Sequence, residues 1–566
     1  MARTTIDRVT TVLARALILL LAFAPIPGFA QALQSPQELN PVQRAPAPEK
    51  PSGNRDLLSP PEPGPCPLAS SSLNFKLTAV TFNGAAAVPP DELAKAYEGY
   101  LGRDVPVSVL CEIRDRASTI LFNQGLFARV EIPAQRIAEG HVTLDVIEAY
   151  IASVRVQGDD SGAQSKVEDY IEMLRGMKPF NIKLAQRYLF LASDVPGVII
   201  TATLRPAGKG RGAIELVITV RHAKPVDAVA NVQNFGSQTT GPWGALERVD
   251  LNGFTPFGER STIVAYETLD IAKQRVIEAI EEARIGSDGL MGHISFSWGE
   301  THPGSTLLAN HLFGQSYVVK PELSYPIVRM RSENLWVAGG LEAVDEKINS
   351  FGARLTQDRI RVFYLRANGD YSWRDVIPGK IWGNVELRQG AGILGASPVG
   401  DPFLSRNKAN PDAFLVRGEG FLNADPFPWL SLTEHVAGQY TAVPLVSYEQ
   451  QSIGNLTIGR GYDPSAVVGD RAVASATDLR LTPPVPKSWP VNGSVYGFFD
   501  TAHVWNLIKG GLNPSWTVRS VGAGVTVDIL SKLHIETTYA HPMDKINKLV
   551  AKRAPDRILV SATVEY

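Results

Sequence analysis

The chain ends in Arg557-Ile-Leu-Val-Ser-Ala-Thr-Val-Glu-Tyr566, and this stretch decides the fold. Its even-numbered residues, from Ile558 to Tyr566, are apolar, and its odd-numbered residues are mostly polar. A period of two is typical of a strand with one face in apolar surroundings. Taken alone, the stretch favours a strand of a soluble sandwich, because a single membrane-barrel strand carries a weak signal. The choice between the two folds therefore depends on how often the pattern recurs upstream.

The alternation recurs throughout residues 223–566, a region without a helical period. Alternating runs lie at residues 292–299, 381–388, 491–505, 521–529 and 533–539. Strands of soluble sandwiches usually have about 5–6 residues, whereas a tilted strand needs roughly 9–11 residues to cross a bilayer. The longer runs approach that length, and lipid tolerates no open sheet edge. The predicted fold class is therefore mainly β, with a transmembrane antiparallel barrel of about 14–18 strands.

The first 72 residues predict an export signal followed by a tether. Arg3, Arg8 and Arg15 flank a short apolar run, and small residues at the −3 and −1 positions predict cleavage after Ala30. The run is too short for a spanning helix, which needs roughly 20 apolar residues, and no later stretch reaches that length. Residues 31–72 contain ten prolines, which predict an extended, semi-rigid segment.

Composition narrows the class of protein. The formal net charge is −2, so no global field favours nucleic acid as a partner. The mean hydropathy of −0.03 argues against a helical membrane protein but not against a barrel, whose lumen-facing residues are polar. Cys66 and Cys111 form an even pair in an exported chain, which suggests one disulfide; the alternative is two free thiols.

Two small modules of the same element order are predicted between the tether and the barrel. Residues 73–150 predict a strand at 75–82, helices at 90–100 and 110–121, and strands at 128–132 and 141–150. The order strand, helix, helix, strand, strand recurs in residues 151–222. Such an internal repeat indicates tandem modules on the periplasmic side of a membrane or along a partner.

Residues 447–480 form the longest candidate loop, centred on Gly459-Arg460-Gly461-Tyr462. Long loops are usually functional or disordered, and flanking glycines let the backbone turn sharply around the arginine. In the alternating run 491–505, Phe498 and Asp500 lie on the face opposite the apolar one, so Asp500 is expected in the lumen. One possibility is a bidentate Arg460–Asp500 pair. The other is two unrelated solvated charges, which cost little in a wet lumen.

These residues carry a family resemblance. The Arg460-Gly461-Tyr462 loop and the strand Phe498-Phe499-Asp500 resemble those of outer-membrane protein-translocating barrels with periplasmic POTRA modules. The two modules resemble the paired POTRA domains of two-partner secretion transporters, the haemolysin secretion/activation protein family. The closest resemblance is in residues 180–220, FNIKLAQRYLFLASDVPGVIITATLRPAGKGRGAIELVITV. A cysteine pair placed like Cys66 and Cys111 also recurs in that family.

The resemblance implies a domain organisation and a set of site residues. Its parts are a signal peptide (1–30), a Pro-rich tether (31–72), POTRA domains (73–150 and 151–222) and a barrel of about sixteen strands (223–566) with a lumenal loop (447–480). It implies that Arg460 at the loop tip contacts Asp500, and that the barrel-assembly machinery reads Tyr566. Three positions depart from the family pattern, namely Asn455, Gly459 and Ala502.

The expected function is export of a large partner exoprotein, such as a haemolysin or adhesin, across the bacterial outer membrane. POTRA domains in the periplasm would capture the exoprotein, outer-membrane lipids would surround the barrel, and a monomer is expected. Alternatives are an outer-membrane assembly or insertion factor, which usually carries more POTRA modules, and a passive porin or a lipase.

No enzymatic motif is found in the sequence. The nine histidines show no metal-ligand spacing, no Gly-x-Ser-x-Gly elbow is present, and residues 208–212 lack the ending of a phosphate loop. Catalytic residues, metal and cofactor are therefore expected to be absent.

Overall fold

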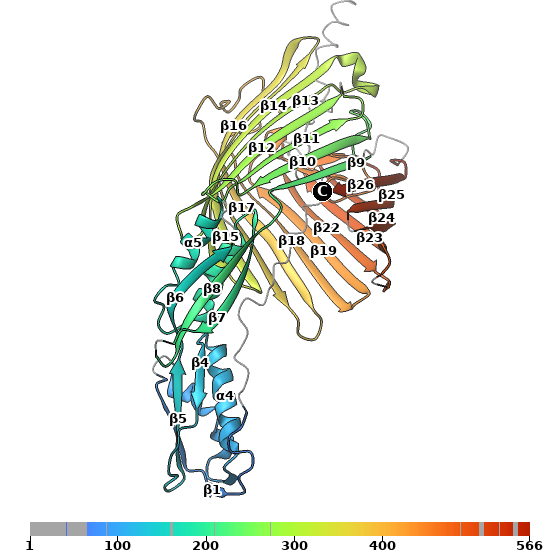
Figure 1. Ribbon diagram of the computed structural model, residues 1–566. Coiled ribbons are helices and arrows are strands. Elements are labelled where there is room, and N and C mark those ends of the chain that lie inside the picture. The colour runs from blue at the N-terminus through green and yellow to red at the C-terminus, as the bar shows by residue number, and fades with distance from the viewer. Residues whose placement is uncertain are drawn as a thin grey trace, which may run out of the picture.

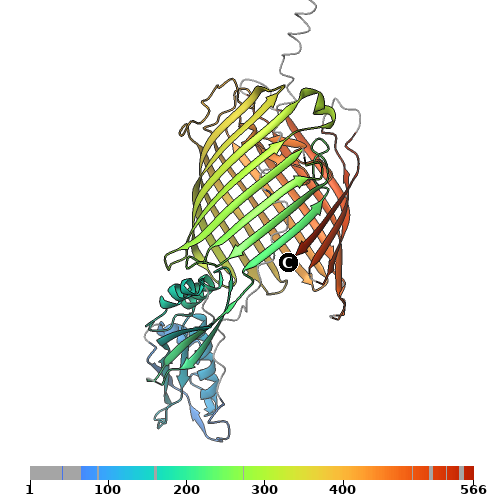
Figure 2. The ribbon, with the colours of Figure 1, turned by 45° about the horizontal axis from the view of Figure 1, so that its top comes forward.

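The computed structural model shows a closed barrel above two small α+β domains, as Figures 1 and 2 show. It describes residue 41 and residues 65–85, 88–158, 162–208, 210–271, 273–486, 488–508, 514–530, 532–546 and 553–566. The predicted signal peptide and nearly all of the predicted tether lie outside the described residues. Within the described part of the chain, no helix is both long and apolar enough to cross a bilayer.

The barrel consists of sixteen antiparallel strands, each paired with its neighbour in the chain order of the wall. They are β9 (Val226–Gln233), β10 (Gly244–Asn252), β11 (Arg260–Thr268), β12 (Gln274–Ile285), β13 (Leu290–Thr301), β14 (Leu312–Arg329), β15 (Glu333–Ser350), β16 (Ala353–Trp373), β17 (Gly379–Gly390), β18 (Phe414–Phe427), β19 (Leu430–Thr441), β22 (Arg471–Leu481), β23 (Val491–Trp505), β24 (Ser515–Ile529), β25 (Leu533–Pro542) and β26 (Arg557–Glu565). The last strand closes on the first through the pairs from Ser561–Gln233 to Glu565–Val229. The prediction of a mainly β transmembrane barrel is confirmed.

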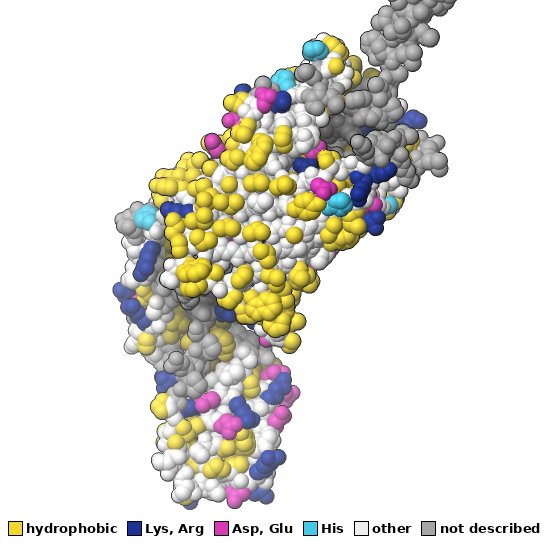
Figure 3. Space-filling model, turned by 90° about the vertical axis from the view of Figure 1, so that its right-hand side faces the viewer, with side chains coloured by type: hydrophobic (Ala, Val, Ile, Leu, Met, Phe, Trp, Pro, Cys, Tyr) yellow, Lys and Arg dark blue, Asp and Glu magenta, His cyan; other side chains and the backbone are white. Residues whose placement is uncertain are grey.

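The two faces of each strand differ as the alternation predicts. In β26, Ile558 and Val564 are exposed on the outer wall, whereas Ser561 and Thr563 are buried in the lumen. There the side-chain nitrogen of Asn231 donates to the hydroxyls of Ser561 (2.8 Å) and Thr563 (2.7 Å) across the closing seam. Figure 3 shows the apolar side chains gathered over the outer wall. Such a wall is stable because lipid covers it, and the polar groups face the interior.

The first N-terminal domain contains a three-stranded sheet and one long helix. Its elements are β1 (Asn74–Lys76), β2 (Ala79–Asn83), α3 (Pro90–Ala94), the 3-10 helix η2 (Glu98–Tyr100), β3 (Asp104–Pro106), α4 (Val109–Asn123), β4 (Ala128–Glu131) and β5 (His141–Glu148). β5 pairs in parallel with β2 and antiparallel with β4.

Two expectations for this domain are wrong. The predicted strand 75–82 is broken at Leu77, which is fully buried in the core while β1 pairs with β3. The predicted helix 90–100 ends at Ala94, and a 3-10 turn containing Gly99 follows, consistent with the low helix propensity of glycine.

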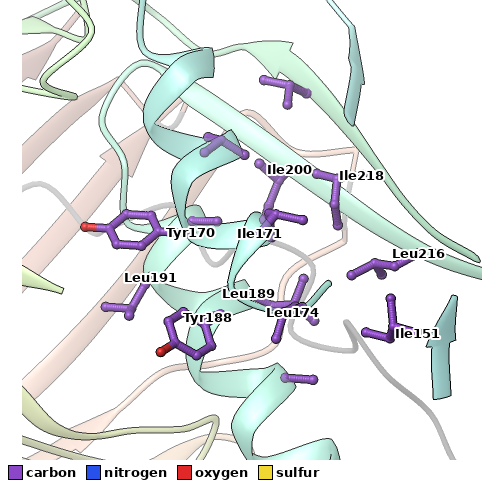
Figure 4. Close-up of a cluster of buried hydrophobic side chains, with 14 of the residues drawn as sticks. Ile151, Tyr170, Ile171, Leu174, Tyr188, Leu189, Leu191, Ile200, Leu216 and Ile218 are labelled. Atoms are coloured by element: carbon purple, nitrogen blue, oxygen red, sulfur yellow. The ribbon is translucent and has the colours of Figure 1, made fainter. Parts of the chain in front are cut away.

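The second domain repeats the sheet arrangement of the first. Its elements are β6 (Tyr150–Gly158), α5 (Gln164–Glu172), α6 (Ile182–Ser193), β7 (Val198–Pro206) and β8 (Ala213–His222), with β8 parallel to β6 and antiparallel to β7. Asn181 caps α6 by accepting a hydrogen bond from the Leu184 amide (3.1 Å). Figure 4 shows the core, in which Ile171 and Leu189 of the helices lie on the side of Leu216 and Ile218 of β8, whereas Tyr170 points away from the sheet.

The second domain is held against the near end of the barrel, where its helices lie in Figure 2. Arg329 at the end of β14 donates two hydrogen bonds to the Asp194 carboxylate, at 2.6 and 2.7 Å. Arg187 of α6 donates to the carbonyl oxygens of Pro326 (2.7 Å) and Asp288 (3.1 Å). Burial beside this contact raises the pKa of Tyr170 to about 12. The barrel and this domain therefore share a polar interface of several directed contacts.

A disulfide joins Cys66 to Cys111 of α4, across a separation of 45 residues. Closing a loop of this length should stabilise the first domain by about 3–4 kcal/mol on the chain-entropy model. Cys66→Ser should therefore lower the urea midpoint of this domain, measured by pulse proteolysis of the full chain in detergent. Reductant should produce the same shift in the wild type and none in the variant; equal midpoints for both proteins would contradict the prediction.

Candidate functional site in the barrel lumen

The connection between β19 and β22, residues 442–470, folds back inside the barrel. It contains the 3-10 helix η4 (Ser447–Glu449) and the two short paired strands β20 (Gln451–Ile453) and β21 (Val467–Gly469). Ile453, Ile458 and Tyr462 of this lumenal loop are buried against the inward-facing side chains of the wall, among them Ala474 and Val518. The loop therefore occupies the path through the barrel on the side of β22–β24.

The predicted loop bounds, 447–480, are wrong at both ends. The chain leaves the wall after Thr441, and residues 471–480 belong to strand β22. The inward-facing residues at the start of this strand are Ala472 and Ala474, so the sequence contrast between its two faces is small. A strand with so little contrast is easily taken for a loop.

Arg460 at the loop tip binds two carboxylates of the barrel wall. Its backbone amide donates to Asp500 Oδ2 (2.8 Å), and its Nη2 donates to Asp500 Oδ1 (2.6 Å). The same guanidinium donates to both oxygens of Asp478 on β22, at 2.6 and 3.1 Å. Asp500 is 1% exposed and also accepts from the Ser520 hydroxyl at 3.0 Å. One loop cation is thus shared by two adjacent strands of the wall.

The other predicted residues of this site lie around Arg460. The guanidinium carbon lies 3.7 Å from the ring centroid of Phe498, which gives a close cation–π contact. The Tyr462 hydroxyl donates to the carbonyl oxygen of Arg519 at 2.9 Å and accepts from the Asp544 amide at 3.0 Å. Gly459 has φ +115°, and a Cβ on Gly461 would lie 2.8 Å from Ser520 Cβ. The two glycines therefore permit the turn and the close approach to the wall.

Two further arginine–carboxylate clusters hold the loop and were not predicted. Arg388 of β17, 1% exposed, donates to Glu449 at the start of the loop (2.6 and 3.0 Å), and to Glu342 and Glu386 of the wall. Arg406, from the β17–β18 connection, pairs with the fully buried Asp470 at the end of the loop at 2.5 Å. In the alternating run 381–388, Arg388 lies on the face opposite the apolar residues, but no local signal links it to Glu449, 61 residues away. The loop is thus bound near its start, tip and end.

Tyr566 lies apart from this site. This residue is 75% exposed, and it lies at the end of the barrel nearest the N-terminal domains. Its amide donates to the carbonyl oxygen of Ala228 on β9 at 2.9 Å, and Lys224 Nζ lies 5.7 Å from its ring centroid. Among the residues that the structure describes, no group of three or more His, Cys, Asp and Glu side chains could hold a metal ion.

Comparisons with known proteins agree with this architecture. The chain is 21% identical over 469 residues to the heme/hemopexin transporter protein HuxB of Haemophilus influenzae, covering 81% of each. It is 22% identical to the hemolysin transporter protein ShlB of Serratia marcescens, covering 86% of this chain and 87% of that protein. The solved structure of CdiB from Escherichia coli has the same fold, with a TM-score of 0.70, 14% identity and 98% of both chains covered. CdiB from Acinetobacter baumannii gives a TM-score of 0.62 at 14% identity, covering 100% of this chain and 98% of that one.

Two family models match the chain directly. The model of the ShlB-type POTRA domain matches residues 75–149, which make up nearly all of the first N-terminal domain. The model of the haemolysin secretion/activation protein ShlB/FhaC/HecB matches residues 212–527, more than half of the chain. The chain therefore belongs to the ShlB/FhaC/HecB family of haemolysin secretion/activation proteins, outer-membrane transporters of two-partner secretion whose N-terminal POTRA domains lie in the periplasm.

Proposed function

We propose that this transporter exports a large haemolysin- or adhesin-like exoprotein, and that the lumenal loop 442–470 shapes and gates its path. The observation that carries the proposal is the Arg460 guanidinium, shared by Asp478 and Asp500 on two adjacent wall strands. Asp500 is 1% exposed, so releasing the loop tip would leave a buried carboxylate without its cation and would be unfavourable in the resting transporter. The ion pairs therefore hold the gate in place until an arriving exoprotein displaces the loop.

Export needs no cofactor in this proposal. The exoprotein enters the lumen unfolded and folds at the cell surface, which makes its return to the periplasm unfavourable. Polar side chains of the lumen solvate the extended chain during passage. The family comprises secretion proteins, and we infer that the chain catalyses no covalent chemistry. We further propose that the transporter is a monomer and that outer-membrane lipids surround its barrel. The barrel-assembly machinery would recognise Tyr566.

The export function is tested by expressing the exoprotein encoded beside this gene, with and without the transporter. The expected result is exoprotein at the surface or in the medium only when the transporter is present. An assembly factor would instead change the levels of other outer-membrane barrels, and a porin would change only the uptake of small solutes. Export that does not depend on the transporter would overturn the proposal.

The POTRA domains would capture the exoprotein by adding its extended chain to a sheet edge. β7 is an edge strand of the sheet β6–β8–β7, and its Ile199 is 46% exposed. Ile199→Lys should lower export severalfold, because a lysine on an edge strand opposes pairing with another chain. The matched control is Leu184→Lys, an equally exposed apolar residue on α6. Equal export by the two variants would remove this edge from the proposed mechanism.

A further inference from the structure

A groove of about 640 Å³ runs along the outer, lipid-facing wall of the barrel across β17, β18, β19 and β22. Its floor consists of Gly418 and Gly438, which face each other in register on β18 and β19. Val385 on β17 pairs with Gly418, and Val473 on β22 pairs with Gly438. These two valines form the sides of the groove. A Cβ added to Gly438 would meet only the Ala472 carbonyl oxygen within 4 Å, at 3.5 Å. The groove therefore exists because two adjacent glycines leave a row of the wall empty.

The groove ends in a polar and aromatic rim formed by Tyr440, Arg471 and Trp505. Arg471 Nε donates to the Thr441 carbonyl oxygen at 2.7 Å, and the guanidinium lies 4.5 Å from the Tyr440 ring centroid. Among the described residues, neither terminal nitrogen of the Arg471 guanidinium has a hydrogen-bond partner. Both nitrogens can therefore donate to an anion. Arg519, which also faces outward on β24, is instead paired with Asp544 at 2.8 Å.

The position of the rim identifies the membrane leaflet. Thr441 and Arg471 are the wall residues on either side of the lumenal loop, at the end of the barrel opposite the POTRA domains. Because those domains lie in the periplasm, this end faces the cell surface. Tyrosine and tryptophan are typical of the interface between lipid and water. The groove thus lies in the outer leaflet, with its charged rim at headgroup depth.

We propose that this groove binds a phosphorylated glycolipid of the outer leaflet, with a phosphate on Arg471 and an acyl chain over Gly418 and Gly438. At headgroup depth an outward-facing arginine is tolerated on a barrel wall, and its free nitrogens can bind an anion there. A guanidinium fork matches phosphate geometry, and basic pockets on membrane proteins commonly hold lipid headgroups. Since Arg471 also bonds Thr441, the bound lipid would brace the two points at which the lumenal loop joins the wall.

The test is binding of defined lipids to the delipidated full-length protein in detergent, measured by native mass spectrometry. The lipids are Kdo2-lipid A, its dephosphorylated form and phosphatidylglycerol. We expect one saturable site for Kdo2-lipid A and at least about tenfold weaker binding by Arg471→Gln, which loses charge-assisted hydrogen bonds. Gly438→Leu should weaken binding similarly, because its side chain fills the groove.

Matched controls separate this site from a general effect of wall substitutions. Arg519→Gln changes an outward arginine that is already paired, and Gly497→Leu adds a side chain to the outer face of β23 with only one atom near its Cβ, at 3.9 Å. Both should bind like the wild type. Undiminished binding by folded Arg471→Gln, or by Gly438→Leu should the arginine variant not fold, would overturn the proposal. Equal binding of dephosphorylated lipid or of phosphatidylglycerol would also overturn it.

Discussion

Arg460→Ala should reduce export of the partner exoprotein by at least about tenfold while the barrel still assembles in the outer membrane. The substitution removes every side-chain contact between the loop tip and Asp478 and Asp500. It also leaves Asp500, 1% exposed, without a cation, which costs up to about 3–5 kcal/mol for a fully buried pair and less beside lumen water. A difference of about 1.4 kcal/mol changes the ratio of two populations tenfold. Even half of the cost of about 3–5 kcal/mol exceeds that value, so the loop tip of the variant should lie mostly off the wall. Secreted exoprotein and heat-modifiable barrel are measured in the same cells.

Two control variants show which property of Arg460 matters. Arg460→Lys keeps the charge but cannot hold two carboxylates in one planar fork, so its export should be intermediate. Arg480→Ala removes another lumen-facing arginine of β22, which bonds Ser494 (2.7 Å) and lies 4.6 Å from the Tyr496 ring centroid. Arg480 resembles Arg460 in its aromatic contact but bonds only wall residues, so this variant should export almost normally. Wild-type export by Arg460→Ala would separate the loop tip from transport.

The barrel could be predicted from the sequence because its physical cause is local. In β26 and β23 the residue that faces lipid must be apolar, and its neighbour faces the lumen, so each strand displays the pattern by itself. Helix and strand ends in the first POTRA domain could not be predicted as well. Residues 75–82 are predicted as one strand, but the strand breaks at Leu77 because the core of the folded domain buries that side chain.

Only part of the lumenal site could be predicted from the sequence. Alternation alone placed Asp500 in the lumen but left its pairing with Arg460 open, and the family resemblance supplied the partner. Asp478 was missed because β22, with Ala472 and Ala474 on its inner face, resembled a loop. Glu342 and Glu449 meet at Arg388 although they are far apart in the chain, and a contact of that separation leaves no trace in local periodicity.

Arg388→Met should destabilise the barrel by about 3–5 kcal/mol, the usual cost of removing one partner from a buried ion pair. The wild-type guanidinium is 1% exposed and contacts Glu342 (3.1 Å), Glu386 (2.9 Å) and Glu449 (2.6 Å). Unfolding in urea, followed by the heat-modifiable band in detergent, measures the change.

The three carboxylates differ in whether they keep a cation after the loss of Arg388, and this difference makes the prediction specific. Glu342 keeps Lys320 at 3.7 Å and Glu386 keeps Arg417 at 2.8 Å, whereas both side-chain oxygens of Glu449 bond Arg388. Glu449→Gln should therefore restore much of the stability lost in Arg388→Met, because it removes the charge left without a cation. In the wild-type background the same change should be destabilising, so the double-mutant cycle should give a clear coupling energy. A double variant as unstable as Arg388→Met alone would show that the cost arises from the wall carboxylates and not from the base of the loop.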